Sequence, residues 1–205
     1  GGASTIEAVA TPLDAAAAAA IGSDDPARVV AASWWLLARN QVRELGRLLE
    51  AAHERWPEAP LIELRLGEYY LKAETGAAPE EDLAAARGHL ESALETAPGL
   101  TRAHGLLAEL ERGAQHLDRA WEHLEDGLRH APEQPDLLLL QHRIARERGW
   151  LVEAADRIER ALALAPGRTD LLDAAVSFYR DAGAVRRLGP LLEEEARRYT
   201  LAEEP

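Results

Sequence analysis

Three prolines divide much of this chain into units of equal length. Pro98, Pro132 and Pro166 lie 34 residues apart (132 − 98 = 34 and 166 − 132 = 34), and each follows an alanine. The segments that end at these prolines are alike: HLESALETAP, HLEDGLRHAP and RIERALALAP. A fixed period of roughly 20–50 residues is typical of proteins built from stacked units, each of which packs on its neighbours. We therefore expect a repeat array.

Each unit is predicted to contain two helices. With the proline at unit position 32, positions 20, 24 and 27 hold small, large and small residues, which lie on one side of a helix. These are Ala86, Leu90, Ala93; Ala120, Leu124, Gly127; and Ala154, Ile158, Ala161. The small residues let a neighbouring helix approach closely, and the large residue fills the gap. Apolar segments that come earlier in each unit indicate another helix, which is the first of the two. They lie at 61–71, 103–110, 137–145 and 171–179.

The turn between the two helices also has a signal. Gly149 and Gly183 stand at unit position 15, where the chain reverses and the backbone has to be permissive. Each unit is therefore predicted to be a pair of antiparallel helices joined by a short turn.

This pattern resembles the tetratricopeptide repeat (TPR) family. The residues that match it most fully are Leu66, Gly67, Tyr70, Ala86, Leu90, Ala93 and Pro98. The resemblance covers about residues 26–198 and implies an all-α solenoid of four to five repeats. The expected repeats are 26–59, 60–100, 101–134, 135–168 and 169–199. Residues 1–25 are expected to hold a capping helix over 12–21, and residues 200–205 a C-terminal tail.

Two departures from the repeat pattern lead to specific expectations. Pro57 and Pro98 are 41 residues apart, one period plus seven, and the extra residues around 73–82 predict a longer second helix in repeat two, with Pro79 at its first position. In repeat four, Gln141 and His142 occupy positions where apolar or small residues normally pack. We expect His142 to be a buried, hydrogen-bonded core residue, with a functional histidine as the alternative.

The composition excludes several kinds of site. The chain has 36 acidic and 23 basic residues, a net charge of −13, which disfavours binding to nucleic acid or anionic lipid. It has no cysteine, so thiolate chemistry and zinc–thiolate sites are excluded. Its apolar run at 15–21 is far shorter than the roughly 20 residues that cross a bilayer. We expect a soluble protein, and cytoplasmic and periplasmic locations both remain open.

The chain carries no signature of catalysis. A Gly-rich phosphate loop, a G-x-S-x-G motif and an H-E-x-x-H motif are all missing. His116, His123 and His130 are spaced by seven, which puts neighbours about 10.5 Å apart along one helix, too far to share a metal ion. The sequence therefore predicts no enzyme activity, no cofactor and no metal site.

The TPR resemblance also implies a surface for a partner. In that family, positions 2, 5, 9, 12 and 13 of the first helices face a concave groove. The candidate groove residues of this chain are Trp34, Leu64, Glu68, Arg102, Glu109, Arg112, Leu139, Arg143, Arg146 and Arg180. One interpretation is a mixed, solvated face, because acidic residues share these rows. The other is a groove with an apolar end and an arginine-bearing end, which would hold an acidic or helical protein segment.

The predicted function is that of a non-enzymatic scaffold or adaptor that binds a protein partner. One alternative is a permanent structural subunit of a larger assembly, joined through its convex face or its ends. The other is a regulatory module of a multidomain protein. Size-exclusion chromatography distinguishes the first two, because a monomer favours the adaptor and a stable oligomer favours the subunit.

Overall fold

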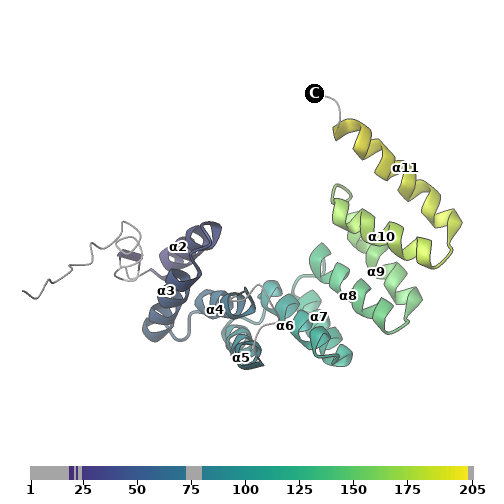
Figure 1. Ribbon diagram of the computed structural model, residues 1–205. Helices are drawn as coiled ribbons and strands as arrows, with labels where there is room; N and C mark the ends of the chain where they lie inside the picture. The colour runs from purple at the N-terminus through teal and green to yellow at the C-terminus, as the bar shows by residue number, and fades with distance from the viewer. Residues whose placement is uncertain (1–18, 21, 23–24, 73–79, 203–205) are drawn as a thin grey trace, which may run out of the picture. The chain divides into compact units, whose positions relative to one another are not determined.

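The computed structural model describes residues 19–20, 22, 25–72 and 80–202, with side chains up to Glu193 except that of Lys72. Over these residues the chain forms helices and no strand, and the main helices follow one another in pairs (Figure 1). They are α2 (Pro26–Ala38), α3 (Val42–Arg55), α4 (Pro60–Lys72), α5 (Glu80–Thr96), α6 (Thr101–Gly113), α7 (Leu117–His130), α8 (Pro135–Glu147), α9 (Leu151–Leu164), α10 (Thr169–Asp181) and α11 (Val185–Ala202). The capping helix expected over 12–21 lies almost wholly outside the described residues.

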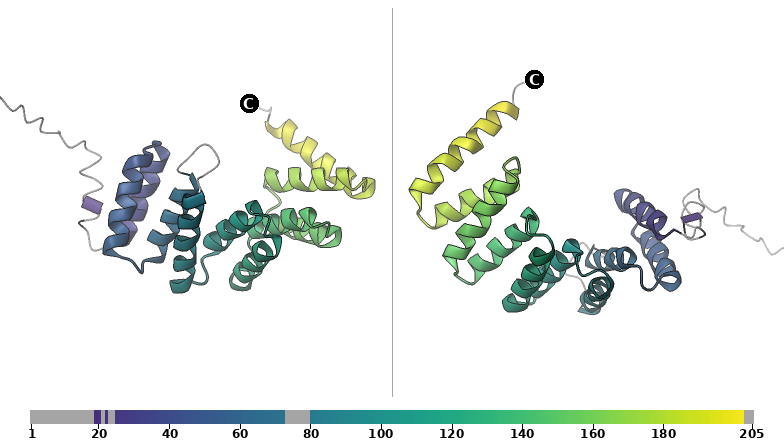
Figure 2. Two further views of the ribbon diagram at one scale, coloured as in Figure 1. Left: turned by 60° about the horizontal axis from the view of Figure 1, so that its bottom comes forward. Right: turned by 180° about the vertical axis from the view of Figure 1, so that it is seen from behind.

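The chain divides into two compact units, residues 1–103 and 104–205. Within each unit, successive helices lie side by side, as both views in Figure 2 show. The four first helices predicted at 61–71, 103–110, 137–145 and 171–179 are confirmed as α4, α6, α8 and α10, each slightly longer than its apolar segment. None of the described helices is long and apolar enough to cross a membrane.

Local signals set where these helices begin and turn. The Asp25 carboxylate accepts a hydrogen bond of 2.9 Å from the backbone N–H of Ala27, which caps α2 ahead of Pro26. Unit position 15 has a positive φ in four turns, at Asn40 (56°), Gln115 (63°), Gly149 (75°) and Gly183 (64°). The two glycines adopt this conformation at no steric cost, so the turn prediction is confirmed there.

The longer second helix of repeat two is also confirmed. Helix α5 has 17 residues, whereas α3, α7 and α9 have 14 each. Glu80, Glu81 and Asp82 form its first turn, where carboxylates favour the positive end of a helix. Pro79 lies outside the described residues. At the other end of the chain, α11 continues to Ala202 because Thr200 stands where a proline would break the repeat.

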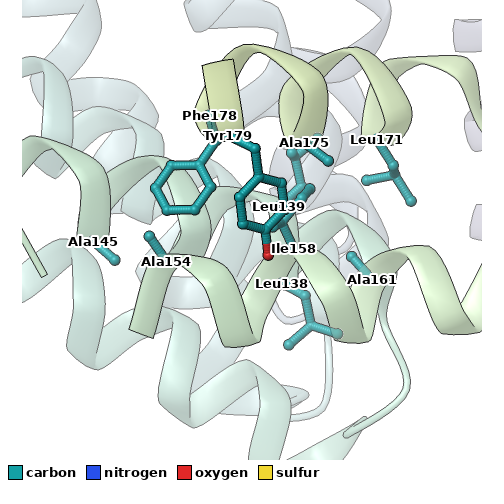
Figure 3. Packing of buried hydrophobic residues seen from close by; sticks show 10 residues of the cluster. All are labelled: Leu138, Leu139, Ala145, Ala154, Ile158, Ala161, Leu171, Ala175, Phe178 and Tyr179. Atoms are coloured by element: carbon teal, nitrogen blue, oxygen red, sulfur yellow. The ribbon is translucent and has the colours of Figure 1, made fainter. Parts of the chain in front are cut away.

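The small–large–small stripe forms the core, as predicted. Its residues in α5, α7 and α9 are all buried. In Figure 3, Ile158 and Ala161 of α9 pack with Leu138 and Leu139 of α8 and with Tyr179 of α10. At Gly127 a Cβ atom would come within 2.8 Å of the Leu137 side chain and 3.0 Å of His104 Cβ, so α7 packs closely on both α8 and α6 there.

Substitution of Ala120 by leucine tests this packing. Ala120 is fully buried against Leu124 and Leu137, and the added side chain has no space to occupy. We expect the free energy of unfolding to fall by about 1–3 kcal/mol through overpacking, as measured by urea denaturation. An unchanged midpoint would contradict the repeat register.

Candidate functional site

In the first unit, α2, α3 and α4 form a pocket of about 210 Å³. It is lined by Leu37, Asn40, Val42, Leu45, Arg65, Glu68 and Tyr69, which come from α2, the following turn, α3 and α4. Most of these side chains are apolar, and the two charged ones are buried. The pocket therefore combines an apolar wall with one buried ion pair.

Arg65 is the centre of that charged group, although only 4% of the residue is exposed. Its guanidinium group forms a short ion pair with Glu68, and its Nε donates a 2.9 Å hydrogen bond to the hydroxyl oxygen of Ser33. The Ser33 hydroxyl in turn donates to the Val30 carbonyl oxygen at 2.6 Å. Glu68 accepts a further bond from Arg102 Nε at 3.0 Å. Two guanidinium groups thus neutralise one buried carboxylate.

Trp34 covers this network. The guanidinium carbon of Arg65 lies 4.1 Å from the centre of the Trp34 ring, which is the geometry of a cation–π contact. The residue remains 55% exposed, so the ring presents a large apolar surface beside the pocket. A partner could contact both the ring and the pocket lining.

In the second unit, two of the four candidate arginines are paired with acids of a neighbouring repeat. Arg112 bonds Glu147 at 2.8 Å, and Arg146 bonds Asp181 at 2.8 Å. These pairs join residues 35 apart, one repeat plus one, so each links the first helices of successive repeats. Much of the positive charge expected on this surface is therefore compensated within the chain.

Arg143 and Arg180 differ from these arginines. Both are exposed, and neither forms an ion pair with any residue that the structure describes. Arg143 lines a shallow depression of about 290 Å³ on α8 together with Arg146 and Glu147. We call these three residues the α8 surface.

The remaining candidates contribute differently. Glu109 is exposed on α6, whereas Leu64 and Leu139 are buried in the packing between helices. The two leucines therefore offer little surface to a partner. The sequence did not predict a role for Ser33 or Arg65. Ser33 is a polar residue at a packing position, and Arg65 is a charged residue three positions before Glu68. Neither feature belongs to the repeat pattern.

His142 is buried and hydrogen-bonded, as predicted. Its ring is fully enclosed, and Nδ1 lies 2.8 Å from the carbonyl oxygen of Ala154. Since a carbonyl can only accept, Nδ1 carries the proton. Nε2 is buried and has no hydrogen-bond partner among the described residues. Burial lowers the pKa of His142 below its ordinary value, and the charges of Arg146 and Arg143 lower it slightly further, against the opposing bond to Ala154.

This environment predicts how stability depends on pH. In the unfolded chain His142 takes up a proton near its ordinary pKa of about 6.5, but in the folded chain it does so only at lower pH. Its contribution to stability is therefore complete above about pH 6.5 and declines as the pH falls below that value. Urea denaturation at pH 7.5 and 5.5 should show a smaller loss of stability for His142→Gln than for the wild type. An equal loss would contradict the assignment.

Comparison with known proteins identifies the fold. No model of a protein family matches the chain, and no curated protein matches it either. Among solved structures, MamA is similar with a TM-score of 0.69 and 14% identity, over 82% of this chain and 96% of MamA. PilF of Pseudomonas aeruginosa has a TM-score of 0.70 and 13% identity, over 90% of this chain and 77% of PilF. YrrB, described as a TPR protein with an unusual peptide-binding site, has a TM-score of 0.62 and 16% identity, over 87% of this chain and 90% of YrrB.

These similar structures are TPR proteins, and the helices of this chain pack in successive pairs as described above. The chain therefore has the all-α solenoid fold of the tetratricopeptide repeat family.

Proposed function

We propose that this chain is a non-enzymatic scaffold or adaptor that binds a protein partner through the surface of its first helices. The observation that carries the proposal is the pair of exposed arginines, Arg143 and Arg180, that have no ion-pair partner among the described residues. YrrB, which has a similar fold, is described as having a peptide-binding site. That description supports a peptide or protein as the class of ligand.

The charge at the α8 surface favours an acidic segment. Arg146 already bonds Asp181, and Arg112 bonds Glu147, so those two guanidinium groups have little to gain from a partner. Arg143 stands beside them with its hydrogen-bonding capacity unused by acids of this chain. A carboxylate that docks there would form a charge-assisted bond, and such bonds are stronger than those between neutral groups. The chain as a whole has a net charge of −13, so a local positive site on it also favours acidic segments over partners of other charge.

The pocket of the first unit supplies a second, apolar contact. Displacing water from Leu37, Val42 and Leu45 by an apolar side chain would favour binding. The exposed ring of Trp34 lies next to this pocket, and a tryptophan that keeps half its surface exposed is a common energetic centre of an interface. The proposed partner therefore carries both acidic and bulky apolar residues.

A peptide array tests the proposal. The fluorescently labelled chain is incubated with arrayed peptides of random sequence, and the composition of the bound peptides is compared with that of the array. We expect enrichment in Asp and Glu, together with aromatic or aliphatic residues. Arg143→Glu and Arg180→Glu should each lower the affinity for the selected acidic peptides at least tenfold, because a favourable charge contact becomes a repulsive one.

Arg119→Glu is the matched control. Arg119 is also an exposed arginine of the second unit without an ion pair among the described residues, and its reversal changes the net charge equally. It lies on α7, a second helix, so we expect binding to change by less than threefold. If Arg119→Glu weakens binding as strongly as Arg143→Glu, the effect arises from total charge, and the proposed surface is wrong. If Arg119→Glu alone abolishes binding, the working surface is that of the second helices.

A further inference from the structure

Two histidines in the first unit share one buried carboxylate. His53 lies on α3, Glu63 on α4 and His89 on α5, so three successive helices meet at this point. His53 Nδ1 is 2.5 Å from Glu63 Oε1, and His89 Nδ1 is 2.8 Å from Glu63 Oε2. The two imidazoles thus bind opposite oxygens of the same carboxylate.

Burial makes this arrangement unusual. The Glu63 side chain is only 1% exposed, and among the described residues its partners are these two imidazoles. A buried carboxylate is stable only when it is paired and hydrogen-bonded. Arg65 and Glu68 meet that requirement nearby with a guanidinium group, whereas Glu63 meets it with two rings that can be neutral.

The same three groups are a ligand set for a transition metal. One ligand atom from each residue can be chosen so that all three lie within 4.8 Å of one another. Two imidazole nitrogens and one carboxylate are a ligand set found in zinc sites, with metal–ligand bonds of about 2.0–2.2 Å. Adjacent ligands of a tetrahedral ion with such bonds are about 3.3 Å apart, so small side-chain rotations would bring the atoms into place.

The surroundings favour these rotations and leave a position open. The ring of His89 stacks on Tyr70, with centroids 5.5 Å apart and planes inclined by 6°, which fixes the plane of that ligand. His53 is the more exposed of the two, at 40%, so its ring can turn and water can reach a fourth coordination position. Neither Nε2 atom is buried without a partner, so each can carry the imidazole proton while Nδ1 faces the metal.

We propose that His53, Glu63 and His89 form a binding site for a divalent transition metal of the zinc class. The nitrogen ligands disfavour Mg²⁺ and Ca²⁺, which prefer oxygen. The metal would replace the two hydrogen bonds to Glu63 by bonds of its own and would neutralise the buried negative charge. Because its ligands come from α3, α4 and α5, it would fasten repeat one to repeat two and stabilise the folded first unit. None of the three residues lines the first-unit pocket, so the site is separate from the proposed partner surface.

The experiment is a titration of the full chain, without a polyhistidine tag, with ZnCl₂ in metal-free buffer at pH 7.5, followed by calorimetry. We expect one Zn²⁺ per chain and a rise in Tm of several degrees that a chelator reverses. Co²⁺ should give visible absorption bands of a four-coordinate nitrogen–oxygen site. His53→Gln and His89→Gln should each lower the affinity at least about 100-fold, more than loss of an outer hydrogen-bond partner costs.

His116→Gln is the matched control. His116 Nδ1 also bonds a buried glutamate, Glu111, at 2.8 Å with 1% of that side chain exposed, and it lies in the second unit, outside the cluster of His53, Glu63 and His89. We expect this variant to bind zinc as the wild type does. Far-UV circular dichroism checks that every variant is folded.

Three results would overturn the proposal. The first is a wild-type chain that binds no Zn²⁺ up to millimolar concentration, even if His53→Gln and His89→Gln lower its stability, since the cluster would then be a structural hydrogen-bond bridge only. The second is binding that survives both substitutions. The third is binding that His116→Gln removes. None of these measurements involves a protein partner, so they are independent of the proposed adaptor function.

Discussion

Replacing Arg65 with methionine is expected to lower the free energy of unfolding by about 3–5 kcal/mol, the cost of leaving a buried charge without its partner. Arg65 is buried, and its loss removes the ion pair with Glu68, the hydrogen bond to Ser33 and the contact with Trp34. Arg102 is 59% exposed and can compensate Glu68 only from the solvent side. Urea denaturation followed by tryptophan fluorescence measures the effect.

The double substitution Arg65→Met with Glu68→Met separates charge from packing. When both members of a buried ion pair are replaced by apolar residues of similar volume, stability is often unchanged or increased by about 1–4 kcal/mol. We therefore expect the double variant to recover most of the stability that the single variant loses. Arg102 then loses its carboxylate, at little cost because it is exposed. A double variant as unstable as Arg65→Met would mean that the loss comes from packing around Trp34 and Ser33.

Replacing Ile158 with alanine is expected to cost about 2–5 kcal/mol. Ile158 is fully buried in the cluster drawn in Figure 3, where it packs with Leu138 of α8 and Tyr179 of α10. The truncated side chain leaves a cavity that three helices cannot close without moving. Chemical denaturation measures the loss.

Leu151→Ala is the control for this substitution. Leu151 lies on the same helix but is 55% exposed, so its truncation should change stability by less than about 0.5 kcal/mol. Similar losses for both variants would show that α9 packs through a different face and would contradict the repeat register.

The α8 surface illustrates how far sequence reasoning reached for the candidate site. Five arginines were predicted to line one surface, but whether they were available depended on the acids opposite them. The pairs Arg112–Glu147 and Arg146–Asp181 join residues one repeat plus one apart, so they form only when successive first helices are stacked in the right rotation. Arg143 and Arg180 stand out only after these pairs are known.

The sequence by itself determined the architecture of this protein. The 34-residue period is visible in the sequence, and the small–large–small stripe and the turn at position 15 are local signals, since each depends on residues within one helix or one turn and recurs in several units. His142 was also predictable, because its repeat position is always packed and a buried imidazole needs a hydrogen bond.

Only the tertiary structure decided which polar groups meet. The ion pair at Arg65 and the cluster of His53, Glu63 and His89 join residues from different helices that occupy unrelated positions in their repeats. No periodicity connects such residues. Burial of apolar side chains determines which faces of the helices pack together. The polar contacts at the edges of those faces depend in addition on the exact rotation and spacing of each pair of neighbouring helices. The candidate sites of this chain arise from those contacts, while its fold arises from the repeat.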